Sequence, residues 1–157
     1  MKTNRVLKIG TQKGFSLIEM IVAVAIIGIL TGIAIPVYIG MKPSIWLSGA
    51  TRQIRGDLMW ARMQAISQNN EFKIFFLANN YQYTILDDDN GDGNIDSGEL
   101  TITKDIHDEY YDVTLTSTAN PIFHPRGNAS PAATVTIANS SGTKTVTIAI
   151  TGRVKIN

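Results

Sequence analysis

The chain has 157 residues, of which 44% are apolar and 17% are charged, and it contains no cysteine. That length is enough for one domain with a hydrophobic core of ordinary size plus an additional segment. The lack of cysteine excludes a disulfide scaffold, a thiolate metal site and a cysteine nucleophile. The formal net charge of +1 is the sum of segments with very different charges.

The first 40 residues have the composition of a membrane segment that follows a basic flank. Residues 1–14 contain four lysines and arginines and no acid, and the stretch from Phe15 to Ile39 has Glu19 as its only charge. As a helix, this stretch is long enough to cross the hydrocarbon layer of a membrane. The basic flank is then expected on the cytoplasmic side, with the rest of the chain on the far side.

This stretch is open to three interpretations: a cleaved secretory signal, a permanent anchor and a buried core helix. A secretory signal has a charge-free apolar run and a small-x-small cleavage site, whereas Glu19 interrupts the run and no such site precedes Pro36. A core helix would show a polar stripe every 3.6 residues, and none is present. The sequence therefore favours an anchor.

Glu19 is the unusual residue of the anchor. A carboxylate within a bilayer costs about 2.5–3.5 kcal/mol, although the cost is smaller near the membrane interface. Because the span contains no other charge, a partner for Glu19 has to come from another chain or from a chain terminus.

The segment KGFSLIE, residues 13–19, resembles the class III signal of type IV prepilins and type II secretion pseudopilins. The resemblance implies that a prepilin peptidase cleaves after Gly14, that Phe15 becomes the N-methylated N-terminus and that the apolar helix is retained. It also implies that Glu19 pairs with the amino terminus of a neighbouring subunit during assembly. Pro36 matches the proline that kinks the helix in that family.

The same resemblance implies the location and partners of the protein. It would be a single-pass protein of the bacterial inner membrane with its head in the periplasm, which an assembly platform and an ATPase push into a helical filament. The filament would be a type IV pilus or a type II secretion pseudopilus, and the chain a minor pilin or pseudopilin. A membrane-anchored domain without assembly partners is the other possibility.

After the anchor, an amphipathic continuation of the helix is expected over residues 40–68. Pro36 and Pro43 should bend or interrupt the helix, because each removes a backbone donor. Apolar residues then recur at steps of three and four, which predicts one buried helix face. These residues are Trp46, Ala50, Ile54, Leu58, Ala61 and Ala65.

From residue 69 onward the apolar period changes to two, which predicts a β-rich globular head over residues 69–157. Strands are expected at 72–77, 81–86, 100–104, 113–116, 133–138, 144–150 and 154–156, with hairpin turns at 78–80 and 139–143. The predicted fold class is α+β, with a long N-terminal helix packed on an antiparallel sheet.

Three short stretches of this region are similar to the GspH/FimT-type branch of pseudopilins and minor pilins. They are LMWARMQA at 58–65, FHPRG at 123–127 and GRV at 152–154.

The acidic stretch DDDNGDGNIDSGE, residues 87–99, fits the calcium-loop pattern D-x-[DN]-x-[DN]-G-x5-E. In that pattern alternate residues turn their oxygens inward, a glycine (here Gly93) makes the sharp turn, and the last carboxylate binds with both oxygens. The expected ligands are Asp88, Asn90, Asp92, the carbonyl of Asn94, Asp96 and Glu99. The flanking segments are predicted strands and not the paired helices of an EF-hand, so a solvated acidic turn is an equally good interpretation.

The sequence contains no recognisable catalytic pattern. His107 and His124 occupy no metal-ligand spacing, no serine lies in Gly-x-Ser-x-Gly, and no phosphate-binding glycine loop is present. We therefore expect no enzymatic activity, and no cofactor other than calcium.

Nucleic-acid binding is an alternative function that the branch resemblance raises. FimT-like minor pilins of DNA-uptake systems bind DNA through a C-terminal Gly-Arg-x-Arg motif, and this chain has Gly152-Arg153-Val154-Lys155. Arg153 and Lys155 would then contact phosphates with a strong dependence on salt. A final strand with exposed basic ends is the interpretation that we favour.

The net charge separates into regions of opposite sign. Cleavage after Gly14 would remove four positive charges and leave ten basic and thirteen acidic side chains. Residues 87–112 contain ten acids and one lysine, a net charge of −9, while the rest of the mature chain has nine basic and three acidic residues. This asymmetry raises the hypothesis that heads of neighbouring subunits attract each other.

Overall fold

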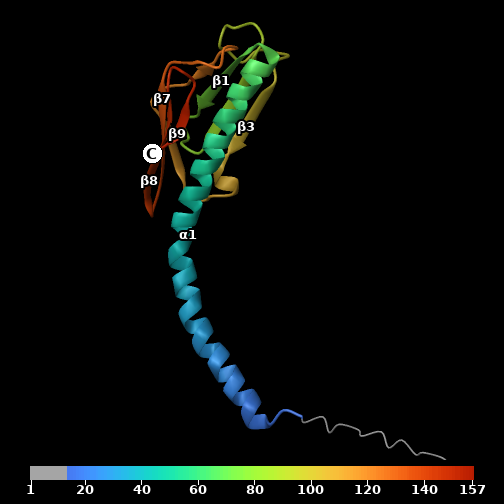
Figure 1. The fold of residues 1–157 in the computed structure, drawn as a ribbon, viewed down its shortest axis with the longest axis vertical. Helices are drawn as coiled ribbons and strands as arrows, with labels where there is room; N and C mark the ends of the chain where they lie inside the picture. Colours follow the sequence, from blue (N-terminus) through green and yellow to red (C-terminus); the bar gives the residue numbers. More distant parts are fainter. Residues whose placement is uncertain (1–13) are drawn as a thin grey trace, which may run out of the picture. The chain divides into compact units, whose positions relative to one another are not determined.

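Helix α1 (Leu17–Gln68) is the longest element of the computed structural model, which describes residues 14–157 (Figure 1). Apart from Gly14, the predicted leader peptide lies outside the described residues. The chain divides into two units at Gly40, and each unit is described by itself.

α1 is unbroken across Pro36 and Pro43, so the expected interruption at these prolines was wrong. Each proline removes one backbone hydrogen bond but leaves the bonds of the neighbouring turns in place. A bend at Pro36 stays a prediction.

The first unit consists of the apolar half of α1, and its side chains are exposed throughout residues 17–40. The helix is long and apolar enough to cross a membrane, and its most apolar window is 0% buried. Large apolar side chains such as Ile26, Leu30 and Ile33 are exposed in the monomer. Contact of such a large apolar surface with water is unfavourable. A membrane or a protein neighbour is therefore the environment in which this unit is stable.

In the second unit, one face of α1 is buried against the head. The buried side chains of this face are Leu47, Ala50, Thr51, Ile54, Leu58, Ala61 and Ala65. The predicted stripe is confirmed from Ala50 onward, but Trp46 is only half-buried at the margin of the core. Leu47, one residue further along the helix, takes the buried position instead.

The head contains two antiparallel sheets, which confirms the predicted α+β class. Sheet A has the strand order β3-β2-β1-β5-β6, and sheet B has the order β4-β7-β8-β9. The strands are β1 (Glu71–Phe76), β2 (Gln82–Asp88), β3 (Thr101–Asp105), β4 (Thr114–Ser117), β5 (Ile122–Phe123), β6 (Ala129–Ser130), β7 (Ala133–Asn139), β8 (Gly142–Ile148) and β9 (Val154–Ile156), and a short 3-10 helix, η1 (Ile106–Asp108), follows β3.

Both sheets share one core with α1. Phe72 and Ile74 of sheet A and Val135 and Val146 of sheet B belong to the same buried cluster as the helix stripe. Alternate residues of β7 are buried, as expected for a strand with one face on a core. The small Ala61 and Ala65 let the strands approach the helix closely, since their side chains occupy little space.

The seven predicted strands are all present, with ends that differ from the prediction by two residues or fewer. β5 and β6 were not predicted, because two residues are too few to show a period of two. The turn expected at 139–143 is shorter than predicted, since β7 and β8 remain paired up to Asn139 and Gly142. Ile150, expected in a strand, follows β8 and is 66% exposed.

Asp57 joins α1 to two strands of sheet A. Its carboxylate accepts a hydrogen bond from the Tyr83 hydroxyl of β2 and lies 2.6 Å from the Lys104 ammonium nitrogen of β3. Burial and the adjacent Asp57 charge raise the pKa of Tyr83 well above its ordinary value, so the phenol remains a hydrogen-bond donor. This contact fixes the rotation of the helix over sheet A.

The three stretches of the GspH/FimT resemblance meet at one point of the head. The Arg62 Nε on α1 donates a hydrogen bond of 2.7 Å to the carbonyl oxygen of Gly127. Gly152 packs against the same carbonyl, and a Cβ atom added there would lie 1.8 Å from the Gly127 oxygen. With a φ of 77°, Gly152 also has a backbone conformation that other residues adopt only with strain. These stretches therefore have a packing role.

Gly152→Ala is expected to destabilise the head by much more than Gly91→Ala. Both glycines have φ values above 70°, but a Cβ at Gly91 meets no atom within 4 Å. Gly91→Ala should therefore cost only the backbone strain, about 1–2 kcal/mol, whereas Gly152→Ala adds a backbone collision. Thermal unfolding of the two variants in detergent measures the difference. Equal melting temperatures would contradict the close approach at Gly152.

Candidate functional site

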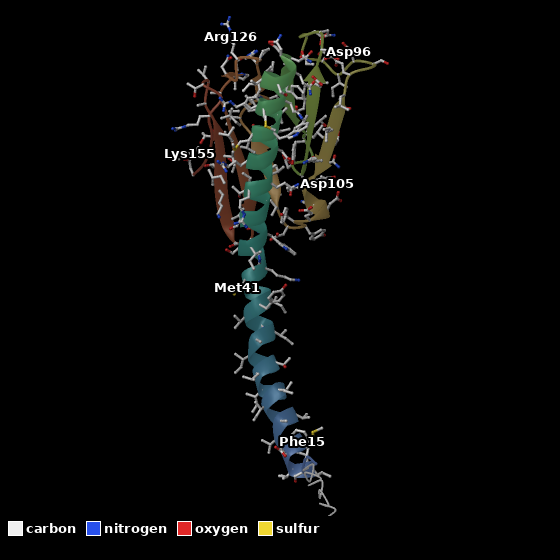
Figure 2. All side chains as sticks on the ribbon, turned by 45° about the vertical axis from the view of Figure 1, so that its right-hand side comes forward. Phe15, Met41, Asp96, Asp105, Arg126 and Lys155 are labelled. Carbon is white, nitrogen blue, oxygen red and sulfur yellow. The ribbon has the colours of Figure 1, made fainter. Side chains whose placement is uncertain are left out.

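The residues predicted to direct processing and assembly lie at the start of α1. Phe15 precedes the helix and is 81% exposed (Figure 2), and Gly14 is exposed as well. Glu19 is in the first turn of α1, where a carboxylate is favoured by the helix dipole. Within residues 14–157 Glu19 forms no ion pair, so the structure leaves its charge available for a partner from outside the described chain.

In the second unit, α1 also has an exposed apolar surface formed by residues outside the buried stripe. Met59, Met63 and Ile66 follow each other at steps of four and three and are 45–58% exposed. They line a groove of about 600 Å³ together with Gly56 and Trp60. An apolar groove on an exposed helix face is typical of a contact surface for another helix.

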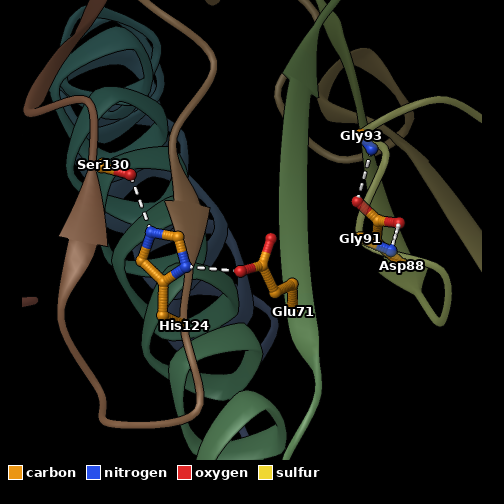
Figure 3. A network of polar contacts seen from close by, with 6 residues as sticks. All are labelled: Glu71, Asp88, Gly91, Gly93, His124 and Ser130. Atoms are coloured by element: carbon orange, nitrogen blue, oxygen red, sulfur yellow. Dashed lines mark hydrogen bonds and ion pairs between the residues drawn. The ribbon is translucent and has the colours of Figure 1, made fainter.

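The acidic loop between β2 and β3 is organised around Asp88. This residue is 0% exposed, and its two carboxylate oxygens accept hydrogen bonds of 2.8 Å from the backbone N–H groups of Gly91 and Gly93 (Figure 3). Both glycines have positive φ values, which permits the tight turn around the carboxylate. The predicted turn at Gly93 is therefore present.

The other predicted ligands of this loop are bonded mainly to each other. Asn90 donates to Asp96, Asp92 accepts the N–H of Asn94, and Glu99 accepts the N–H of Asp96. Among the described residues no group of three His, Cys, Asp or Glu side chains is placed to hold a metal ion. The predicted ligands thus share one loop without converging on one point.

Two further observations describe the electrostatics of the loop. The Glu99 Oε1 atom is buried and has no hydrogen-bond partner. Burial raises the pKa of Asp87, helped by the negative charges of Asp89, Glu99 and Asp88, while a hydrogen bond from Asn70 lowers it. The Lys73 ammonium, which donates to the Gly93 carbonyl at 2.6 Å, is the cation that contacts this loop.

His124 lies in a polar network that the sequence did not predict. Its Nδ1 is 2.7 Å from Glu71 Oε1 and its Nε2 is 2.7 Å from Ser130 Oγ (Figure 3). Glu71 begins β1 and Ser130 ends β6, so the imidazole joins two strands of sheet A that are not neighbours in the sheet. Sequence reasoning could not find this network, because Glu71 and His124 are 53 residues apart.

Lys155, one residue of the nucleic-acid alternative, lies on β9 of sheet B, and Arg153, the other, directly precedes this strand. Both line a groove of about 400 Å³ whose other polar walls are threonines and Asn157. No acidic residue lines this groove. The arrangement favours a negatively charged occupant, whether a phosphate chain or a carboxylate surface.

Two family models match the chain. The model for type II transport protein GspH matches residues 50–152, and the model for the prokaryotic N-terminal methylation motif matches residues 10–35. A comparison of the sequence with curated proteins found no significant match.

Among solved structures, the chain is similar to a minor pilin and a minor pseudopilin. The type IV minor pilin FimU of Pseudomonas aeruginosa is 20% identical, with a TM-score of 0.54 over 71% of this chain and 87% of that chain. The minor pseudopilin EpsH from the type 2 secretion system of Vibrio cholerae is 12% identical, with a TM-score of 0.56 over 70% of this chain and 94% of that chain. At these identities, the similarity establishes a shared fold.

Proposed function

The chain belongs to the GspH family of minor pilins and pseudopilins and carries the N-terminal methylation motif, and we propose that it is a filament subunit of a type IV pilus or a type II secretion pseudopilus. The observation that carries this proposal is the fully exposed apolar segment 17–40, whose one charge, Glu19, forms no ion pair within residues 14–157. Members of this family are structural subunits, so the proposed activity is assembly and not catalysis.

The exposure of Gly14 and Phe15 supports processing at this junction. A prepilin peptidase would cleave after Gly14 and leave the amino group of Phe15, methylated, at the N-terminus of the apolar helix. Phe15 is 81% exposed and lies outside α1, so the peptide bond before it needs no unfolding of the helix to be reached.

Assembly would join this new amino group to the Glu19 carboxylate of a neighbouring subunit. In an apolar environment an unpaired carboxylate costs about 2.5–3.5 kcal/mol, and an opposite charge from a neighbour offsets this cost. The exposed groove of Met59, Met63 and Ile66 would extend the helix contact along α1 into the head. Before assembly the subunit would be held in the inner membrane by residues 15–39, with its head in the periplasm.

Glu19→Ala is expected to insert into the membrane and to be processed, but to fail in assembly. The substitution makes the segment more apolar, so insertion should not weaken, while the partner of the neighbouring amino group is lost. Thr31→Val is a matched control, because Thr31 bonds within its own helix, to the Ile27 carbonyl. Filaments sheared from cells and the membrane fraction measure the two steps. Normal filament incorporation of Glu19→Ala would contradict the mechanism.

Calcium binding by the β2–β3 loop is a second proposed property, and the free buried Glu99 Oε1 supports it. Burial is the main cause of the raised pKa of Asp87, and a cation would relieve the repulsion from neighbouring carboxylates that adds to it. The ligands would be Asp88, Asn90, Asp92, the carbonyl of Asn94, Asp96 and Glu99. Binding would require the contact between Asn90 and Asp96 to open. The role would be to order the loop.

Calcium is expected to raise the melting temperature of the full chain in detergent. For a weak site with a Kd of about 0.1–1 mM, a calcium concentration of about 10 mM stabilises the fold by about 1.4–2.7 kcal/mol. Magnesium should have a smaller effect, and Glu99→Gln should remove the response to calcium. A calorimetric titration without heat, together with an unchanged melting temperature, would overturn calcium binding.

Nucleic-acid binding through Arg153 and Lys155 receives less support. These two cations would contact few phosphates, and affinity for nucleic acid rises with each phosphate neutralised. Carboxylates on a protein surface could pair with the two cations of this groove equally well, and the chain itself has such a surface.

A further inference from the structure

The head carries a row of acidic side chains without cationic partners along one side, which we call the acidic edge. Its members are Asp89, Asp92, Asp96, Asp105, Asp108 and Glu109. They lie in the β2–β3 loop, at the end of β3 and around η1, and β3 is the edge strand of sheet A. None of them forms an ion pair within residues 14–157.

The hydrogen-bond donors to the acidic edge are neutral. Asn70 donates to Asp89, Asn90 to Asp96 and Gln82 to Asp105. The two lysines on this side are engaged elsewhere, because Lys104 pairs with Asp57 and Lys73 donates to the Gly93 carbonyl. These contacts therefore add no ion pair to the acidic edge within residues 14–157.

Three cationic side chains form what we call the basic face: Arg126 in the turn between β5 and β6, Arg153 directly before β9, and Lys155 on β9. All three residues are exposed, and none of them forms an ion pair among the residues that the structure describes. Lys155 is on β9, the edge strand of sheet B, opposite Thr147 of β8. The groove beside it offers the neutral hydroxyls of Thr118, Thr134 and Thr147 as hydrogen-bonding groups.

The acidic edge and the basic face lie on opposite sides of the head. Figure 2 shows Asp96 and Asp105 on one side and Arg126 and Lys155 on the other, with α1 between them. A two-fold symmetric pair would bring like charges together wherever the same side meets itself. Complementary patches on different sides instead favour a head-to-tail contact, and such contacts generate open helical assemblies unless the rotation closes.

We propose that the basic face of one head docks on the acidic edge of a second copy of this chain. The inference rests on the proposed function, since a filament places heads of neighbouring subunits next to each other. The carboxylates enter the groove beside Arg153 and Lys155, and the threonine hydroxyls donate further hydrogen bonds. The contact sets the order and orientation of the heads, while the apolar helices hold the filament together.

The lack of cysteine permits a direct test with two reporter positions in full-length chains. Ala132 is exposed and lines the groove of the basic face, and Thr101 is exposed on β3 between the two halves of the acidic edge. One copy carries Ala132→Cys and the other Thr101→Cys, and both are produced in the same cells. A short bis-maleimide then joins the two copies only where the basic face meets the acidic edge.

Charge reversal separates electrostatic docking from mere proximity. Arg153→Glu with Lys155→Glu in the first copy, or Asp108→Lys with Glu109→Lys in the second, should each lower the cross-linking yield by about tenfold. Combining both reversed copies should restore the yield, which also shows that the reversed heads are folded. Higher salt should lower the yield of the unreversed pair, since exposed charges are screened.

Three results would overturn the proposal. One is a cross-linking yield that charge reversal does not change. Another is a yield that falls with each reversal and does not recover in the combined pair. The third is a yield lowered by an excess of duplex DNA that binds the unreversed head but not the Arg153→Glu/Lys155→Glu head, which assigns the groove to nucleic acid.

The failure of this proposal is distinct from the failure of the proposed function. Filaments sheared from the same cells report assembly through the helices, independently of the cross-link. Filaments without the charge-dependent cross-link leave the proposed function in place and overturn the docking of the heads. The absence of both filaments and cross-link overturns both.

Discussion

The buried stripe of α1 is the contact on which the head depends. Side chains from Leu47 to Ala65 meet residues of both sheets in one cluster, so neither sheet has a complete core without the helix. Polar contacts add to this packing: Asp57 of α1 contacts β2 and β3, and Arg62 of α1 donates to the Gly127 carbonyl. Lys144 of β8 donates to the Ser48 hydroxyl of α1. The side chains of the same helix are exposed throughout residues 17–40. One part of α1 therefore completes the core of the head, and the exposed part is left for contacts with other subunits.

The charged side chains of the head also fall into two groups, those that are paired within the head and those that are not. Polar groups that the fold uses are paired inside the head, as in the ion pair of Lys104 with Asp57 and the hydrogen bond between His124 and Glu71. Those on the acidic edge and the basic face lack ionic partners among the described residues, and they lie on different sides of the head. Like charges that are gathered on one side repel each other in the free subunit. Contact with a surface of opposite charge on another subunit would relieve this repulsion.

The sequence predicted those features that depend on local pattern. The apolar period gave α1 and the seven longer strands, and the charge-free run gave the exposed segment. It did not predict β5, β6 or the network of Glu71, His124 and Ser130, because these depend on contacts between distant residues. The structure excludes an interruption of α1 at Pro36 and Pro43, since the helix keeps its other backbone bonds, while a bend there stays a prediction. The short motifs around Arg62, Gly127 and Gly152 indicated a branch, and the structure adds that they pack against each other.

The central claim is that the chain becomes a filament subunit after cleavage at the junction of Gly14 and Phe15. Mass spectrometry of the protein isolated from its native membrane tests this claim most directly. The account predicts a mature chain that begins with a methylated Phe15. Retention of Met1, or cleavage near Ala34, would contradict it.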